Sequence, residues 1–110
     1  MTFVFVYLSE AHASDVWPVN QLEFGVKKHR SEEDRMAAAT ILRKNYAALC
    51  DSMDYCVLDT MEDTFNGVFA SWPLRYWCIG ESGDVTFKAM PKNSCYRVEE
   101  FEAFLRATFK

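Results

Sequence analysis

The first residues of the chain constrain its fold more than any other segment. Residues 3–8 read Phe-Val-Phe-Val-Tyr-Leu, a run of β-branched and aromatic side chains with no polar position between them. A run without polar alternation predicts a strand that is buried on both faces, as in a parallel sheet. Such a strand is covered by helices, so this run favours an α/β fold.

The rest of the chain is consistent with that fold. Ser31 predicts the cap of a helix that runs to about residue 49, because acids fill the first turn and apolar residues recur at helical spacing. Its predicted inward face is Ala37, Ala38, Ile41, Leu42, Tyr46 and Leu49. A short helix is predicted near residues 65–70. Residues 97–109 predict a closing amphipathic helix whose inward residues are Val98, Phe101, Phe104 or Leu105, and Phe109.

Three further strands are predicted at residues 55–59, 75–79 and 85–88, the last two joined as a hairpin by the turn at 81–84. The order β-α-β-β-β-α predicts an α/β sheet of mixed direction flanked by helices. A length of 110 residues fits a single domain over residues 1–110.

Composition argues against several classes of partner and site. The net charge of −4, with a longest basic run of only four residues (27–30), argues against nucleic acid. None of the four cysteines forms a C-x-x-C pair, so no metal site is predicted. The cysteine usage predicts a reducing, cytoplasmic location. No apolar stretch is long enough to span a bilayer.

The cysteines offer no clear nucleophile. Cys56 and Cys78 lie in apolar runs and are predicted to be buried. Cys50 is predicted at a helix C-terminus, where the dipole disfavours a thiolate. Cys95, in a loop before the last helix, is the best candidate of the four.

The segment after the first strand carries the best candidate site. Functional groups in open α/β sheets gather beyond the carboxyl ends of parallel strands, which here is the segment from Ser9 to Asp15. If the strand geometry persists, Glu10 and His12 leave on the same face, and a carboxylate beside an imidazole suits proton transfer near neutral pH. The alternative is a capped turn, in which Ser14 or Asp15 bonds to backbone amides and His12 is merely exposed.

Three more polar positions have both a structural and a functional interpretation. His29 precedes the helix cap, and a solvated basic turn is the favoured interpretation. Arg75 opens an apolar strand, so it must reach solvent, pair with an acid or bind an anion. Asp59 follows a predicted strand, and a helix cap is favoured over a site carboxylate.

These residues lie within motifs that resemble the iodothyronine deiodinase family. Residues 7–17, Tyr-Leu-Ser-Glu-Ala-His-Ala-Ser-Asp-Val-Trp, resemble that family's Y-I-E-E-A-H-x-S-D-G-W. His29-Arg30-Ser31, Asp34-Arg35 and the alanines that follow them resemble H-R-S-x-x-D-R-x-x-A-A, and residues 57–61 resemble V-V-D-T-M. Residues 72–76, Trp-Pro-Leu-Arg-Tyr, resemble the Pro-x-Arg part of L-P-E-R-L-Y. The matches cover roughly residues 3–105 in order.

The resemblance implies a thioredoxin-like fold and reductive removal of iodine from an iodothyronine such as thyroxine. A selenocysteine attacks the iodine in that family, no cofactor is bound, and a thiol of glutathione or thioredoxin type is the cosubstrate. Glu10 and His12 would handle protons, and His29 would assist. His12 and Arg75 would hold the two ends of the substrate, in a pocket that also includes Ser14, Asp15 and Trp17. Pro73 falls where such folds often place a cis-proline.

The sequence departs from the family pattern in two respects. Val16 replaces the usual Gly, and the segment that carries the selenocysteine is absent, so the resemblance implies a thioredoxin-like sheet without its first β-α unit. We hypothesise that a UGA codon taken as a stop explains a start at Met1, which the upstream nucleotide sequence would test. The resemblance also implies a homodimer, with a membrane anchor only in the missing part.

Without that unit, the strands at 3–8 and 75–79 would each lose a neighbour, and we expect this chain to fold poorly or self-associate. We also expect it to be inactive alone, because acid–base groups without the attacking atom recover only part of such a catalyst. Two alternative functions remain open from the sequence. One is a thioredoxin-like binding module without turnover, and the other is a thiol-dependent reductase or peroxidase that uses a cysteine.

Overall fold

A computed structural model describes residues 1–18, 25–92 and 95–109. The chain divides into two compact units, Met1–Pro73 and Leu74–Lys110. Both combine strands with helices, so the predicted α/β class is confirmed. The single domain over residues 1–110 stays a prediction. Within the described ranges, no helix is both long and apolar enough to cross a membrane.

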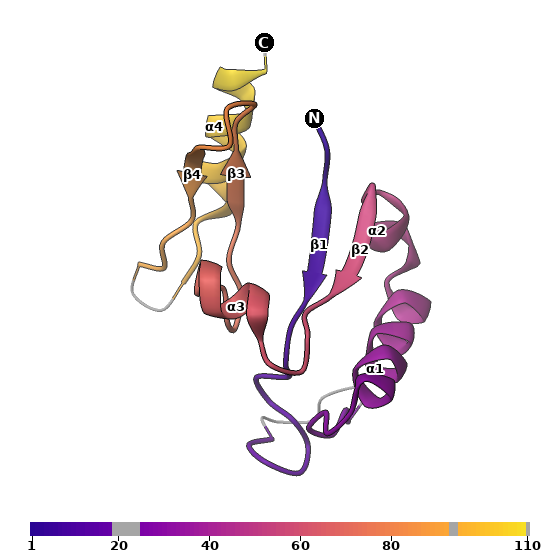
Figure 1. Ribbon diagram of the computed structural model, residues 1–110. Helices are drawn as coiled ribbons and strands as arrows, with labels where there is room; N and C mark the ends of the chain where they lie inside the picture. The colour runs from indigo at the N-terminus through magenta and orange to yellow at the C-terminus, as the bar shows by residue number, and fades with distance from the viewer. Residues whose placement is uncertain (19–24, 93–94, 110) are drawn as a thin grey trace. The chain divides into compact units, whose positions relative to one another are not determined.

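The first unit is built around two parallel strands. Strand β1 (Val4–Tyr7) pairs with β2 (Tyr55–Leu58), with Val4 opposite Tyr55 and Tyr7 opposite Leu58. Helices α1 (Glu32–Asn45) and α2 (Ala47–Asp51) connect the two strands, and the short helix α3 (Thr64–Phe69) follows β2. Figure 1 shows both arrowheads at the same end of the pair, where α1 also begins.

Helix α1 begins where the sequence predicts and ends four residues earlier. The Ser31 hydroxyl accepts a hydrogen bond from the Asp34 amide (3.1 Å), and the Asp34 carboxylate accepts one from the Arg30 amide (2.8 Å). This reciprocal capping satisfies two amides that the helix leaves free. The Asn45 side chain then donates to the Ile41 carbonyl (2.8 Å) and competes with the helical backbone pattern. Tyr46 leaves the helical conformation, and α2 starts after it.

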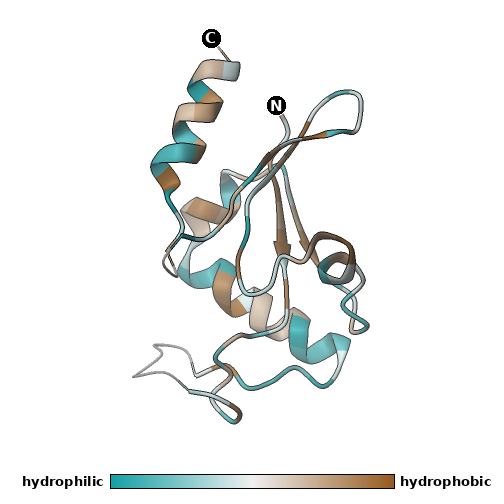
Figure 2. Cartoon of the chain, turned by 90° about the vertical axis from the view of Figure 1, so that its left-hand side faces the viewer, coloured by the Kyte–Doolittle hydropathy of each residue, from teal (hydrophilic) through white to brown (hydrophobic). Residues whose placement is uncertain are grey.

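The second unit is a hairpin with one helix. Strands β3 (Trp77–Ile79) and β4 (Val85–Lys88) are antiparallel, and α4 (Val98–Thr108) follows. Phe101 packs on Tyr76 and Phe87 with ring centroids 5.4 Å apart in each pair. Figure 2 shows the helix that ends at the C label with hydrophobic and hydrophilic residues interleaved, as an amphipathic helix requires.

The expected burial of the strands is wrong. Val4 is 54% exposed, and Tyr55, Cys56 and Val57 on β2 are exposed as well. In the described residues each sheet has only two strands, so neither β1 nor β2 is enclosed by neighbours. The strand predicted at 75–79 is also shorter, since residues 75 and 76 precede β3.

The predicted helix faces are right in part. Ala38 is buried and Leu42 half-buried on α1, whereas Ala37, Ile41, Tyr46 and Leu49 are exposed. The buried stripe instead begins at Arg35, a position that the apolar pattern does not include. On α4, Phe101, Phe104 and Leu105 turn inward, and Val98 and Phe109 at the helix ends remain exposed.

Candidate active site

The candidate site lies at the carboxyl ends of β1 and β2. The segment after Tyr7 and the segment after Leu58 leave the sheet at the same end, as expected of parallel strands. His29, just before α1, and Arg35, in its first turns, come to the same region. The residues that the sequence singled out after the first strand therefore lie at the carboxyl edge of the sheet.

His29 is the centre of this site, and the solvated turn favoured from sequence is wrong. The residue is only 5% exposed, and its ring stacks on Tyr7 with centroids 5.7 Å apart. Its Nδ1 accepts a hydrogen bond from Arg35 Nε (3.1 Å). An arginine has only donors, so Nδ1 carries no proton and a neutral ring carries its proton on Nε2. That Nε2 is buried, has no hydrogen bond, and lies 3.8 Å from Glu10 Oε1.

Burial and Arg35 both oppose a charge on His29. Burial lowers the pKa of His29 most, the nearby carboxylate of Glu10 raises it, and the Arg35 guanidinium lowers it again. The net direction of the pKa is downward. Protonation of His29 Nδ1 would place its N–H against the N–H of Arg35 Nε. This contact therefore also favours a lowered pKa for His29. The site therefore holds a neutral imidazole with one defined tautomer.

Glu10 is paired with Tyr7 and His29, whereas His12 has another partner. The Tyr7 hydroxyl donates to Glu10 Oε1, and burial together with this bond raises the pKa of Tyr7. The predicted Glu10–His12 face assumed that the strand continues, but β1 ends at Tyr7 and residues 11–12 form a turn. His12 Nδ1 lies 3.3 Å from the Trp17 carbonyl, and its ring meets the Trp17 ring edge-on at 4.8 Å. Trp17 is 61% exposed.

Ser14 and Asp15 hold the segment that leads to His29. The Ser14 hydroxyl donates to the Gly25 carbonyl (3.0 Å), and the Lys28 amide donates to Asp15 (2.8 Å). That amide lowers the pKa of the Asp15 carboxyl, and Arg30, 3.5 Å away, contributes in the same direction. The alternative considered from the sequence is therefore right in part: Asp15 binds a backbone amide, but Ser14 donates to a carbonyl and His12 is half-buried against Trp17.

Arg35 was not predicted as a site residue from the sequence, and Asp59 was predicted only as a helix cap. Arg35 is 3% exposed, and its Nη1 donates to the carbonyls of Asp59 (3.0 Å) and Thr60 (2.7 Å). Its Nη2 lies 3.7 Å from Asp63. The Asp59 carboxylate accepts from the amides of Thr60, Phe65 and Asn66, so the predicted cap, here of α3, is confirmed.

Two signals in the sequence could have identified the missed residues. Tyr7 lies three residues before Glu10 at a strand end, where a phenol can reach back to a carboxylate. Arg35 lies three and seven residues before Ala38 and Leu42, so it is a cation on the buried stripe of α1. A buried arginine needs partners, and those partners mark a polar site.

Arg75 belongs to the second unit, just before β3. Its Nη1 lies 3.8 Å from the sulfur of Met90, and its Nε is buried without a hydrogen bond. Among the described residues no carboxylate lies within ion-pair distance of Arg75, so the acid partner, one of the three options left by the sequence, is not found there. The peptide bond between Trp72 and Pro73 is cis, as the resemblance implied.

The cysteines do not supply an activated thiol to this site. Cys50 is buried and Cys78 half-buried, and burial raises the pKa of both thiols, opposite to the shift that a nucleophile needs. Cys95 is exposed, as a loop residue should be. Cys56 is exposed too, so its predicted burial is wrong. Within the described ranges, no group of three or more His, Cys, Asp or Glu side chains could hold a metal ion.

Comparison with known proteins agrees with the motifs. The family model of iodothyronine deiodinase matches residues 1–109. Thyroxine 5-deiodinase of Sus scrofa is 31% identical over 94% of this chain and 32% of its own length. Type I iodothyronine deiodinase of Xenopus laevis is 35% identical over 89% of this chain and 36% of its own. Type II iodothyronine deiodinase of Mus musculus is 32% identical over 97% and 40%. The chain thus spans about a third of the length of these relatives, and it belongs to the iodothyronine deiodinase family.

Proposed function

We propose that this chain forms the proton-handling and substrate-contacting part of an enzyme that reductively removes iodine from an iodothyronine such as thyroxine. The observation that carries the proposal is the connected set Tyr7–Glu10–His29–Arg35, a partly buried acid–base arrangement at the carboxyl edge of the sheet. The names of the relatives support this substrate class.

Reductive deiodination replaces a carbon–iodine bond with a carbon–hydrogen bond, so the reaction needs a proton as well as an attacking nucleophile. In this proposal a selenolate from a segment outside this chain takes the iodine from the ring carbon, which gains the proton. Two thiols of glutathione or thioredoxin type then restore the selenolate, and iodide and a disulfide are released. Glu10 accepts a hydrogen bond from the Tyr7 hydroxyl, and its Oε1 faces His29 Nε2. Glu10 and His29 can therefore pass a proton to the substrate carbon that loses iodine. Arg35 fixes the His29 tautomer in which the proton lies on Nε2, the nitrogen that faces Glu10.

The half-buried His12 and the exposed Trp17 are the proposed contacts for the iodinated aromatic ring, because the two rings meet after the end of β1 and the Trp17 ring is accessible. Ser14 and Asp15 contribute by holding the His29 segment in place. Arg75 is the proposed partner of the substrate's anionic group, since its buried Nε has no hydrogen bond among the described residues.

We also propose that the complete protein has a thioredoxin-like sheet in which a further β-α unit pairs with β1. The support is that β1 has one strand partner in the described residues and that the relatives are about three times longer. Dimerisation, a membrane anchor outside this chain and a cytoplasmic location for the chain itself stay predictions.

The test measures iodide release from thyroxine with dithiothreitol, using the 110-residue chain and the same chain joined to an upstream segment that carries selenocysteine. We expect no iodide from the chain alone and turnover from the joined protein. In the joined protein, Glu10→Gln and His29→Gln should each lower kcat by roughly 10²-fold or more, the usual share of general acid–base catalysis. Lys44→Gln, on the exposed last turn of α1, is the matched control.

The outcomes separate the alternatives. A joined protein that binds thyroxine but releases no iodide would be a binding module and would overturn the proposal. Activity of the chain alone that disappears in Cys95→Ser would favour the thiol-dependent reductase. Full activity of Glu10→Gln would remove the proposed role of the acid–base set, whatever the substrate.

A further inference from the structure

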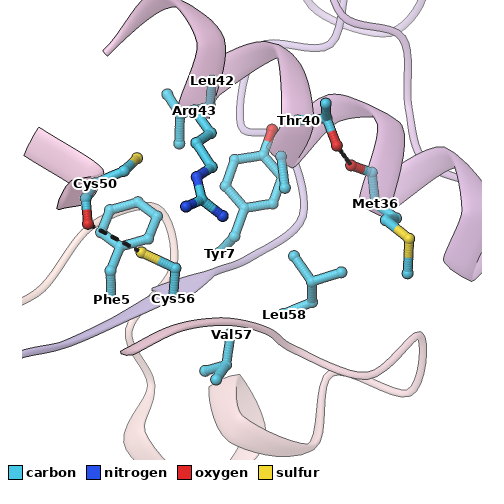
Figure 3. A pocket seen from close by; sticks show the side chains of 11 residues that line it. Phe5, Tyr7, Met36, Thr40, Leu42, Arg43, Cys50, Cys56, Val57 and Leu58 are labelled. Atoms are coloured by element: carbon cyan, nitrogen blue, oxygen red, sulfur yellow. Dashed lines mark hydrogen bonds between the residues drawn. The ribbon is translucent and has the colours of Figure 1, made fainter. Parts of the chain in front are cut away.

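A second feature of the first unit lies on the helix side of the sheet. A partly open cavity of about 240 Å³ is lined by residues of α1, α2 and the two parallel strands. Most of its lining is apolar, but the side chains of Cys50, Cys56 and Arg43 also face it, as Figure 3 shows. The proton-handling set does not use either cysteine.

The two cysteines approach each other across the short turn between α2 and β2. Cys50 is one residue before the end of α2, and Cys56 is the second residue of β2. The Cys56 thiol lies 3.7 Å from the carbonyl oxygen of Cys50, the contact drawn as a dashed line in Figure 3. Both residues are free thiols in this structure.

Their surroundings differ in a way that suits two successive steps. Cys56 is exposed, so a small disulfide can reach it, whereas Cys50 is 9% exposed. Burial raises the pKa of Cys50, and the nearby Cys56 thiol raises it further. Arg43 from α1 lowers this pKa and Asp51 raises it, so the cavity holds one cation that can stabilise a transient Cys50 thiolate.

We propose that Cys50 and Cys56 form a reversible intramolecular disulfide by exchange with a low-molecular-weight disulfide such as oxidised glutathione. The Cys56 thiolate attacks one sulfur of the glutathione disulfide; that bond breaks, and one glutathione leaves as a thiolate and takes a proton. Cys50 then loses its proton to solvent and attacks the Cys56 sulfur, which expels the second glutathione. The two protein thiols are oxidised, and one glutathione disulfide is reduced to two thiols.

The other two cysteines do not share this arrangement. Cys78 on β3 and Cys95 belong to the second unit, and neither lines the cavity. In a reducing compartment a bond of this kind would be transient and would report the redox state rather than hold the fold. It would tether α2 to β2 on the cavity side of Tyr7, whose ring also lines the cavity.

The test incubates the reduced 110-residue chain with oxidised glutathione, quenches with acid, alkylates free thiols, and maps disulfides by mass spectrometry without reduction. We expect the Cys50–Cys56 linkage to exceed every other pairing. The same reaction in urea should form this linkage roughly tenfold more slowly, because the folded chain supplies the proximity. Cys50→Ala should trap glutathione on Cys56, Cys56→Ser should leave Cys50 largely unmodified, and Cys95→Ser should leave the linkage unchanged.

Three results would overturn the proposal. The first is glutathione that stays on Cys56 in the unsubstituted chain, because it would mean that Cys50 does not resolve the mixed disulfide. The second is a Cys50–Cys56 linkage that forms as fast in urea as in buffer. The short separation of the two cysteines in the sequence, not the fold, would then bring them together. The third is equal modification of Cys50 in the Cys56→Ser chain, because the first attack would then not belong to Cys56.

Discussion

The tautomer of His29 is set by an arginine and not by an acid. Arg35 occupies Nδ1 as a donor, so the ring can be charged only if that contact is given up. Histidines beside carboxylates usually gain basicity, yet here burial and Arg35 outweigh Glu10. Arg35 therefore sets the tautomer of the central residue, and burial together with Arg35 keeps its ring neutral.

This arrangement makes the stability of the first unit depend on pH. The pKa of His29 is lower in the folded chain than its usual value of about 6.5, so the unfolded chain binds more protons between those two values. The free energy of unfolding is therefore complete above about pH 6.5 and falls as the pH drops toward the folded pKa. Urea titrations at several pH values should show this fall, and His29→Gln should remove it. Asp15, whose folded pKa is also lowered, acts only in the more acidic range below its ordinary value. A wild-type profile that is flat between pH 7 and 5 would contradict the prediction.

Arg35 should contribute more to stability than any exposed arginine of the unit. Arg35→Ala leaves the carbonyls of Asp59 and Thr60 and the Nδ1 of His29 without their donor, a loss of about 2–4 kcal/mol. Arg35→Lys keeps the charge but loses the planar guanidinium with its several donors, so it should recover only part of the lost stability. Arg30→Ala is the control, since its ion pair with Asp15 is largely exposed and should cost no more than about 1 kcal/mol. Equal midpoints for the alanine variants in urea would refute this ranking.

The sequence predicted single residues best where one local rule decides. Ser31 and Asp59 were placed correctly as caps because capping depends on the next few residues. The role of His29 could not be predicted in this way, because its ring is buried by a tyrosine and an arginine from two other elements. Arg35 shows the same limit, since its partners lie 24 and 25 residues further along the chain.

At the scale of elements, the predicted order was right and the boundaries shifted by a few residues. The hairpin strand 85–88 was predicted with its observed bounds, and the closing helix lost only one residue at each end. Periodicity alone did not show the break at Tyr46, which depends on a side-chain bond from Asn45. Burial was harder to predict than type, because it depends on how many neighbours a strand has.

Helix α3 should depend on Asp59 for its existence. Six residues are too few for a stable helix, and the Asp59 carboxylate accepts the amides of Phe65 and Asn66 at its start. Asp59→Ala should cost about 1–3 kcal/mol and expose these amides. Hydrogen exchange at Phe65 and Asn66 measures the effect directly. Glu62→Gln is the control, because this exposed carboxylate lies in the turn just before α3. Unchanged exchange at both amides in Asp59→Ala would refute the assignment.

At the scale of the molecule, the best-buried large side chains are polar. The buried apolar residues in the described ranges are Ala13, Ala38, Cys50 and Ala89, whereas His29 and Arg35 are each 5% exposed or less. A two-stranded sheet encloses little apolar surface, so the polar site carries an unusual share of the packing. This explains why the sequence predicted the α/β class correctly but overestimated the burial of β1 and β2.

The open edge of β1 should make the isolated chain self-associate. Phe3 and Tyr7 direct their carbonyls to the β2 segment, so alternate residues Val4 and Val6 direct their backbone groups to the other edge. In the described residues no strand covers that edge. An uncovered row of this kind pairs readily with a second copy. Sedimentation velocity over a range of concentrations should therefore show a mass that rises with concentration.

Val4→Pro tests the cause of this association, because it removes a backbone donor from the open edge without removing a bond to β2. Association should weaken by about 1 kcal/mol for each hydrogen bond lost. Val4→Thr removes apolar surface but keeps the donor, so it should associate as the wild type does. Phe5→Pro, whose donor faces β2, should instead disrupt the sheet and unfold the unit. If Val4→Pro and Val4→Thr weaken association equally, exposed apolar side chains, not the open edge, drive it.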